Sequence, residues 1–143
     1  NVQTIGPDKL NQLRQLHFFN DLNGLRTHMR AHARILKPKF DLVEKILQRE
    51  LGDKQIAQWS KPAGGYFVNL NVPDGFARQI IALTAEAGVT LTPAGASFPH
   101  GLDPNDRNIR IAPTFPALED VRQAMEILTL CVELVAIRDR LRR

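Results

Sequence analysis

One arginine stands out among the residues that could do chemistry. Arg110 lies in the segment NDRNIRIAPTF (105–115), which alternates polar and apolar side chains as a strand does. Ile109 and Ile111 would point to one face of a sheet, and Arg110 to the other. A guanidinium is a planar fork that matches a carboxylate, and a strand would fix its root. The segment therefore indicates either an anion-binding residue or an arginine that is paired with a neighbouring acid or solvated.

Other chemically active residues give weaker signals. His28 and His32 lie one helical turn apart but lack further ligands at metal spacing, so we interpret them as surface residues and expect no metal site. Cys131 falls on the apolar stripe of the last predicted helix, where a buried and inert thiol is expected. The sequence contains neither a Gly-x-x-x-x-Gly-Lys-Ser/Thr phosphate loop nor a recognisable nucleophile elbow.

The composition is that of an ordinary globular chain. Its 143 residues are 43% hydrophobic and 24% charged, enough for one domain with a core. The net charge of +4 arises in residues 1–54, with ten Lys and Arg against six Asp and Glu, while residues 55–143 have nine of each. Basic clusters with interleaved aromatics are missing, so nucleic-acid binding is not expected. Apolar runs fall short of the roughly 18 residues that span a membrane, so we expect no membrane contact and a cytoplasmic location.

Two helices are predicted in the N-terminal third. The first covers residues 7–19, with Pro7 in its first turn. The second covers residues 21–51, where Asp21 is a suitable cap and apolar residues recur at spacings of three, four or seven. Pro38 lies within this stripe and should bend the helix. A long bent helix packed on a domain fits the pattern better than a coiled-coil seam, because the flanking charges are not regular.

The remaining sequence predicts strands and further helices. Strands are expected at 56–60, 66–72, 89–92 and 108–112, and helices at 74–87 and 116–140. Asp74 would cap the first of these helices. Few strands beside long helices predict the α+β class, with a small mixed sheet, helices packed on one face, and the long bent helix before it. Arg110 and Asn69 would then lie on the sheet face that the helices leave open.

Taken in order, these segments resemble a known family. The turn WSKPAGGYF, the segment AGVTLTPAGASF, the strand NIRIAPTF and the long final helix are similar to the C-terminal small domain of pyridoxal-phosphate-dependent class I/II (fold-type I) aminotransferases. TIGPDKLNQLRQLHFF and HMRAHARILKPKFDLVEKIL resemble, more specifically, the MocR-like aspartate aminotransferase subgroup. The resemblance covers essentially all of residues 1–143, as a helical frame (1–54) and an α/β sandwich (55–143). With an opening that lacks methionine, it implies a piece of a longer chain.

The resemblance also implies roles for single residues. Arg110 matches the arginine that binds the substrate α-carboxylate, and Tyr66 and Phe67 match a segment that shapes the substrate side of the cleft. The implied reaction transfers an amino group between an amino acid, such as aspartate, and a 2-oxo acid. None of the six lysines matches the family's Schiff-base lysine. Pyridoxal phosphate is therefore expected in the longer protein but not in this chain, which alone should be inactive. The implied partners are the substrate, a large cofactor-binding domain and a second copy in a homodimer.

Two alternatives stay open at this point. The chain could be an aminotransferase-like, effector-binding domain of a MocR-type transcription regulator, whose DNA-binding part would lie at the far N-terminus of the longer protein. It could also be a stand-alone structural α+β module in which Arg110 is merely paired. The sequence before Asn1 would separate them, because a Ser-x-x-Lys motif there would indicate the catalytic lysine.

Overall fold

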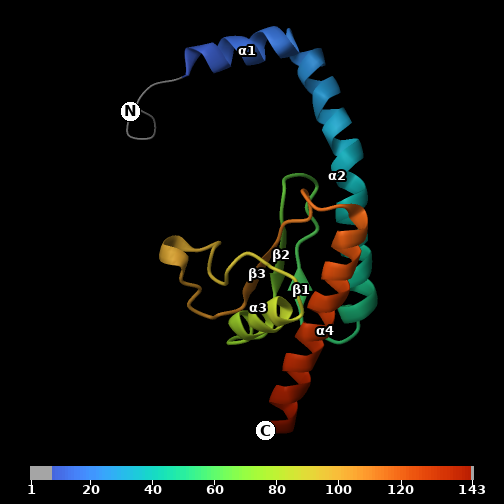
Figure 1. Ribbon diagram of the computed structural model, residues 1–143, viewed down its shortest axis with the longest axis vertical. Helices are drawn as coiled ribbons and strands as arrows, with labels where there is room; N and C mark the ends of the chain where they lie inside the picture. Colours follow the sequence, from blue (N-terminus) through green and yellow to red (C-terminus); the bar gives the residue numbers. More distant parts are fainter. Residues whose placement is uncertain (1–7, 143) are drawn as a thin grey trace. The chain divides into compact units, whose positions relative to one another are not determined.

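The computed structural model describes residues 8–142. They belong to two compact units that divide between Lys37 and Pro38. The first unit contains helix α1 (Lys9–Phe19) and the first part of helix α2 (Leu22–Leu51), and the second unit contains the rest of α2 and all later elements (Figure 1). Both helices predicted for the N-terminal third are confirmed.

An aspartate precedes each helix of the first unit. The carboxylate of Asp8 accepts a hydrogen bond from the N–H of Asn11 at 3.0 Å, and that of Asp21 accepts one from the N–H of Gly24 at 2.8 Å. Each bond satisfies a backbone donor that has no partner within its helix. The cap predicted at Asp21 is confirmed, whereas the role predicted for Pro7 falls outside the described residues.

Helix α2 continues through Pro38. Proline has no N–H, so the carbonyl one turn earlier loses its helical partner at this point. The helix nevertheless persists, since its second half is anchored in the core by four buried side chains: Val43, Ile46, Leu47 and Leu51. This anchoring supports the packed helix over a coiled-coil seam for the second half of α2. The bend at Pro38 stays a prediction.

The sheet has three strands in the order β1 (Gln58–Trp59), β2 (Val68–Asn71) and β3 (Asn108–Ile111). Both pairs are antiparallel, so the expected mixed sheet is in fact antiparallel throughout the described residues. The reason is topological: β1 and β2 form a hairpin, and the connection through helix α3 returns β3 in the direction opposite to β2. In the register of β2 and β3, Asn69 lies opposite Arg110.

Helices cover one face of this sheet. Helices α3 (Ala77–Glu86) and α4 (Leu118–Arg142) contact each other, and α4 lies beside the second half of α2 (Figure 1). The sheet contributes to this core the buried side chains of Val68, Leu70, Ile109 and Ile111. Cys131 is buried in α4, as expected. The predicted α+β class, with a long helix before the sheet, is confirmed.

Two local predictions are wrong. Residues 89–92 form no strand; Leu91 packs against the core, and the segment runs as a connection without pairing to the sheet. Asp74 does not cap α3. The N–H of Arg78 donates instead to Oδ1 of Asp106 at 3.2 Å, so the carboxylate at this helix start comes from the loop before β3.

Candidate carboxylate-binding site

Arg110 lies on the face of β3 that is turned away from the helices. Its neighbours along the strand, Ile109 and Ile111, are buried in the core, and side chains alternate between the two faces of a sheet. Arg110 is half-buried, and Asn69, opposite it on β2, is exposed. The prediction that Arg110 and Asn69 share the face away from the core is therefore confirmed.

The guanidinium of Arg110 has an unsatisfied donor. Its Nε is buried and has no hydrogen-bond partner among the residues that the structure describes. A buried donor without a partner costs about 1–3 kcal/mol, so such groups are rare and call for an explanation. Acidic side chains do not supply one here, because no ion pair to Arg110 is found within residues 8–142. An acceptor from outside these residues would remove the cost.

Phe67 holds the guanidinium in place. The Cζ atom of Arg110 lies 4.7 Å from the centre of the Phe67 ring, a cation–π contact worth about 0.5–2 kcal/mol. Phe67 itself is 47% exposed, so the pair lies at the surface of the sheet. Tyr66 is 58% exposed, and within the described residues no ring contact or hydrogen bond joins it to Arg110. The structure therefore brings Phe67, but not Tyr66, to the arginine.

Three asparagines lie beside Arg110 on the same face. Asn108 is buried, and its side-chain Nδ2 donates to Oδ1 of Asn69 at 2.6 Å and to Oδ1 of Asn71 at 2.9 Å. These amides cross-link β2 and β3 next to the arginine. No role was predicted for Asn71 and Asn108, although the alternation in VNLN and NIR places them on the face of Arg110.

Asp103 fixes the loop that leads into β3. Its Oδ2 accepts from the N–H groups of Arg107 and Asn108, both at 2.8 Å, and its Oδ1 accepts from the N–H of Asn105 at 3.0 Å. Burial acts to raise the pKa of Asp103, but the three backbone N–H groups and the nearby charge of Arg107 outweigh it and lower the pKa below its usual value. Asp103 is thus held as a carboxylate at the entry to the strand. The cluster of Asp, Asn and Pro in LDPNDRN was the available signal for it.

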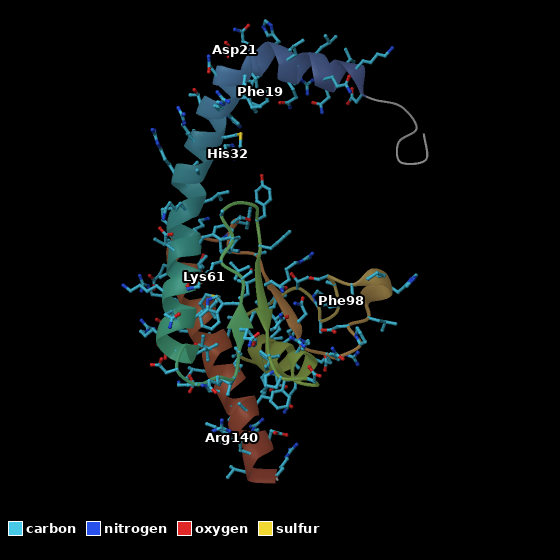
Figure 2. All side chains as sticks on the ribbon, turned by 180° about the vertical axis from the view of Figure 1, so that it is seen from behind. Phe19, Asp21, His32, Lys61, Phe98 and Arg140 are labelled. Atoms are coloured by element: carbon cyan, nitrogen blue, oxygen red, sulfur yellow. The ribbon has the colours of Figure 1, made fainter. Side chains whose placement is uncertain are left out.

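Gly95 lies where the loop before β3 approaches its own backbone at Gly101. A Cβ at this position would lie 2.1 Å from the carbonyl oxygen of Gly101, and the backbone of Gly95 has a φ of 82°. Only glycine accepts both the left-handed conformation and this close approach. The position therefore requires glycine. The loop contains the single turn η1 (Pro99–Gly101), and Phe98, just before that turn, lies on the part of the loop that projects from the sheet (Figure 2).

Two of the lysines, Lys54 and Lys61, are held in ion pairs at the surface. Lys61 pairs with Glu44 of α2 at 2.5 Å and is seen beside that helix in Figure 2, and Lys54 pairs with Glu133 at 2.6 Å. Both lysines are on the exposed surface, whereas pyridoxal phosphate requires a lysine placed to attack its aldehyde beside groups that bind its phosphate. Lys54 and Lys61, each paired with a glutamate, are therefore not placed to hold the cofactor.

Two hollows in the described surface lie away from Arg110. One, of about 200 Å³, is lined by residues 55–58 and 71–74 with Arg107, and the other, of about 430 Å³, lies between Lys54 and Arg140. Neither is lined by Arg110. An open face can form one wall of a cleft that a second body closes.

The histidine pair of the first unit contacts aromatic rings. The rings of His28 and His32 lie 4.4 Å apart, and His28 also packs against Phe18 and Phe19. Groups of three or more metal-ligating side chains are not found in the part of the chain that the structure describes.

Among residues 8–142, no helix is long and apolar enough to cross a membrane.

Comparison with known proteins identifies the family. The model of the family described as aspartate amino-transferase matches residues 1–143. The chain belongs to this family. A protein of Mycolicibacterium smegmatis, described as an aminotransferase, is 52% identical over 134 residues, and the aspartate aminotransferase of Corynebacterium glutamicum is 44% identical over 135 residues. Each match covers 94% of this chain and 31% of the relative, so the chain spans about a third of the length of these proteins.

Solved structures agree with this assignment. An aspartate transaminase from Corynebacterium glutamicum superposes with a TM-score of 0.89 at 43% identity, covering 96% of this chain and 32% of that one. The α-aminoadipate aminotransferase LysN of Thermus thermophilus, solved with N-(5'-phosphopyridoxyl)-L-leucine, has a TM-score of 0.67 at 21% identity and covers 80% of this chain and 29% of that one. The second likeness shows a shared fold alone.

Proposed function

We propose that this chain is the small-domain part of a pyridoxal-phosphate-dependent aminotransferase and that Arg110 binds the α-carboxylate of its substrate. The reaction would move an amino group between an amino acid, with aspartate as the first candidate, and a 2-oxo acid. Membership of the aspartate aminotransferase family supports the reaction class. The buried and unpartnered Nε of Arg110 is the observation that supports the carboxylate site.

The arrangement around Arg110 suits an amino-acid carboxylate. The strand fixes the root of the side chain, the ring of Phe67 restricts the guanidinium, and the unsatisfied Nε provides a donor directed by the planar fork. A carboxylate that bridges two guanidinium N–H groups would satisfy this donor and gain charge-assisted hydrogen bonds. Phe67 and Asn69 beside the guanidinium are exposed, so the ligand can approach from the side away from the core. Phe67 would also line the cleft, as the family resemblance implies for it and for Tyr66.

The cofactor belongs, in this proposal, to the other two thirds of the enzyme. Pyridoxal phosphate supplies the electron sink for the chemistry at the substrate Cα. This chain contributes orientation: it holds the carboxylate so that the Cα of the substrate faces the cofactor-binding domain. We further propose that the whole protein belongs to the MocR-like subgroup, acts in the cytoplasm and is a homodimer. The curated relatives described as aminotransferases favour an enzyme over the regulator alternative.

Kinetics of the whole enzyme test the role of Arg110. Arg110→Lys keeps the charge but loses the fork, and Arg110→Ala loses both, so kcat/KM should fall by roughly 30- to 1,000-fold for every α-carboxylate substrate, whatever its side chain. Arg107→Ala is the matched control, because that arginine lies three residues away and its guanidinium is 3.8 Å from Asp74. Wild-type kcat/KM in Arg110→Lys, measured by transamination with aspartate and 2-oxoglutarate, would refute the proposed role.

A further inference from the structure

In the polar network beside Arg110, the side-chain amide of Asn69 uses its oxygen but not its NH₂ group in hydrogen bonds to described residues. Asn69 lies directly opposite Arg110 in the antiparallel register, where Cβ atoms on the same face are about 4.5–5.5 Å apart. Its Oδ1 accepts from the Nδ2 of Asn108 at 2.6 Å. Within residues 8–142, the NH₂ group of Asn69 has no hydrogen-bond partner, and the side chain is exposed.

Asn108 determines how the Asn69 amide is oriented. Asn108 is only 7% exposed, and its own position is fixed, since its backbone N–H donates to Asp103 and its Nδ2 to two asparagine oxygens. Because the oxygen of Asn69 is engaged with Asn108, the NH₂ end of the amide is the end left for a ligand. The network thus presents one fixed neutral donor next to a fixed cation.

A carboxylate has room for both donors. Its two oxygens offer about four lone-pair sites, of which a guanidinium fork occupies two. The guanidinium of Arg110 leans over Phe67, which comes just before β2 and two positions before Asn69. A carboxylate bound to Arg110 at this face would therefore lie within reach of the adjacent amide.

We propose that Asn69 donates a second hydrogen bond to the carboxylate that Arg110 binds and that Asn108 is the positioning residue for Asn69. This inference rests on the proposed function, because it takes the same carboxylate as its ligand. Asn71 accepts from the same Nδ2 of Asn108 but lies opposite Asn108, two cross-strand pairs away from Arg110. Asn71 therefore belongs to the network without reaching the ligand.

The test compares Asn69→Ala, Asn71→Ala, Asn108→Ala and Arg110→Lys in the whole enzyme, each checked by its melting curve. Asn69→Ala should raise KM for aspartate and for 2-oxoglutarate by roughly 10- to 100-fold and leave kcat within about threefold, because the hydrogen bond is equally present in the bound substrate and the transition state. Asn71→Ala should change KM less than about twofold. Asn108→Ala should raise KM, and adding it to Asn69→Ala should raise KM no further.

The possible outcomes separate this inference from the proposed function. Equal effects of Asn69→Ala and Asn71→Ala, beside a normal loss in Arg110→Lys, would show that the network only joins the strands, and this inference alone would fail. Additive effects of Asn69→Ala and Asn108→Ala would likewise refute the positioning role. Wild-type kinetics in Arg110→Lys would overturn the carboxylate site and this inference together. Asn69→Asp gives an independent check: a negative charge beside Arg110 should weaken substrate binding more than alanine does.

Discussion

The two units of the molecule both contain apolar residues at helical spacing, but among the described residues only the second unit buries them. No described residue from 8 to 37 is buried, and large side chains such as Leu13 and Ile35 are 62% and 65% exposed. From residue 38 onward the chain has a closed core, in which Ile109 and Leu128 have no exposed surface. An apolar stripe in a helix therefore shows that a face can be buried, but not that its partner is present in the same unit.

Helix α2 shows the difference within one element. Its stripe includes Leu22 and Met29 in the first unit and Val43 and Leu47 in the second, at equivalent helical spacing. The first two are 58% and 61% exposed, and the last two have no exposed surface. The second unit can therefore be expected to carry the stability of this chain, and the first to add little to it.

The largest effect should come from the same substitution made in the two units. Ile109→Ala removes a fully buried side chain and leaves a cavity, so the free energy of unfolding should fall by about 2–5 kcal/mol. Ile35→Ala, on the exposed face of α2, should change it by no more than about 0.5 kcal/mol. Urea unfolding of the 143-residue chain, followed by circular dichroism, measures both. Comparable losses would show that the first unit has a core of its own.

A smaller effect is expected at the loop that leads into β3. Asp103→Asn keeps the shape but loses the charge that accepts three backbone N–H groups, so the chain should be about 1–3 kcal/mol less stable at pH 7. Since the pKa of Asp103 is lowered by folding, its stabilisation is complete above the ordinary value near 4 and is lost as the pH falls through the lower folded value. The difference between the two proteins should therefore shrink below about pH 4.

Asp74→Asn is the control for this experiment. Asp74 is also an aspartate near a helix start, but its side chain is 67% exposed and lies 3.8 Å from Arg107. An exposed ion pair of this kind contributes about 0–1 kcal/mol, so the substitution should have little effect at any pH. If Asp103→Asn were equally mild, the loop would not depend on its carboxylate, and the geometry of β3 would have to be set by the strand pairing alone.

Features that depend on neighbouring residues could be predicted from the sequence, whereas contacts between segments far apart in the chain could not. The cap at Asp21 was predictable because its acceptor and donor lie three residues apart, whereas the start of α3 is bound by Asp106, which follows that helix in sequence. Alternation predicted the face of Arg110, because it depends only on the strand. The contact of Arg110 with Phe67 and the amide network of Asn108 required the register of β2 against β3, which alternation does not determine.

The smallest expected effect concerns the arginine itself. In this chain, Arg110→Met should change the free energy of unfolding by less than about 1 kcal/mol, although the side chain is half-buried in the second unit. The substitution loses the contact with Phe67, worth about 0.5–2 kcal/mol, but also removes a buried Nε whose missing partner costs about 1–3 kcal/mol. Methionine keeps an apolar stem of similar reach against the sheet. Unfolding curves of Arg110→Met and Ile109→Ala, measured side by side, compare the loss of unfolding free energy at two adjacent residues of β3. A loss close to that of Ile109→Ala would mean that Arg110 serves the core rather than a ligand, and the stand-alone structural module would then be the better account of this chain.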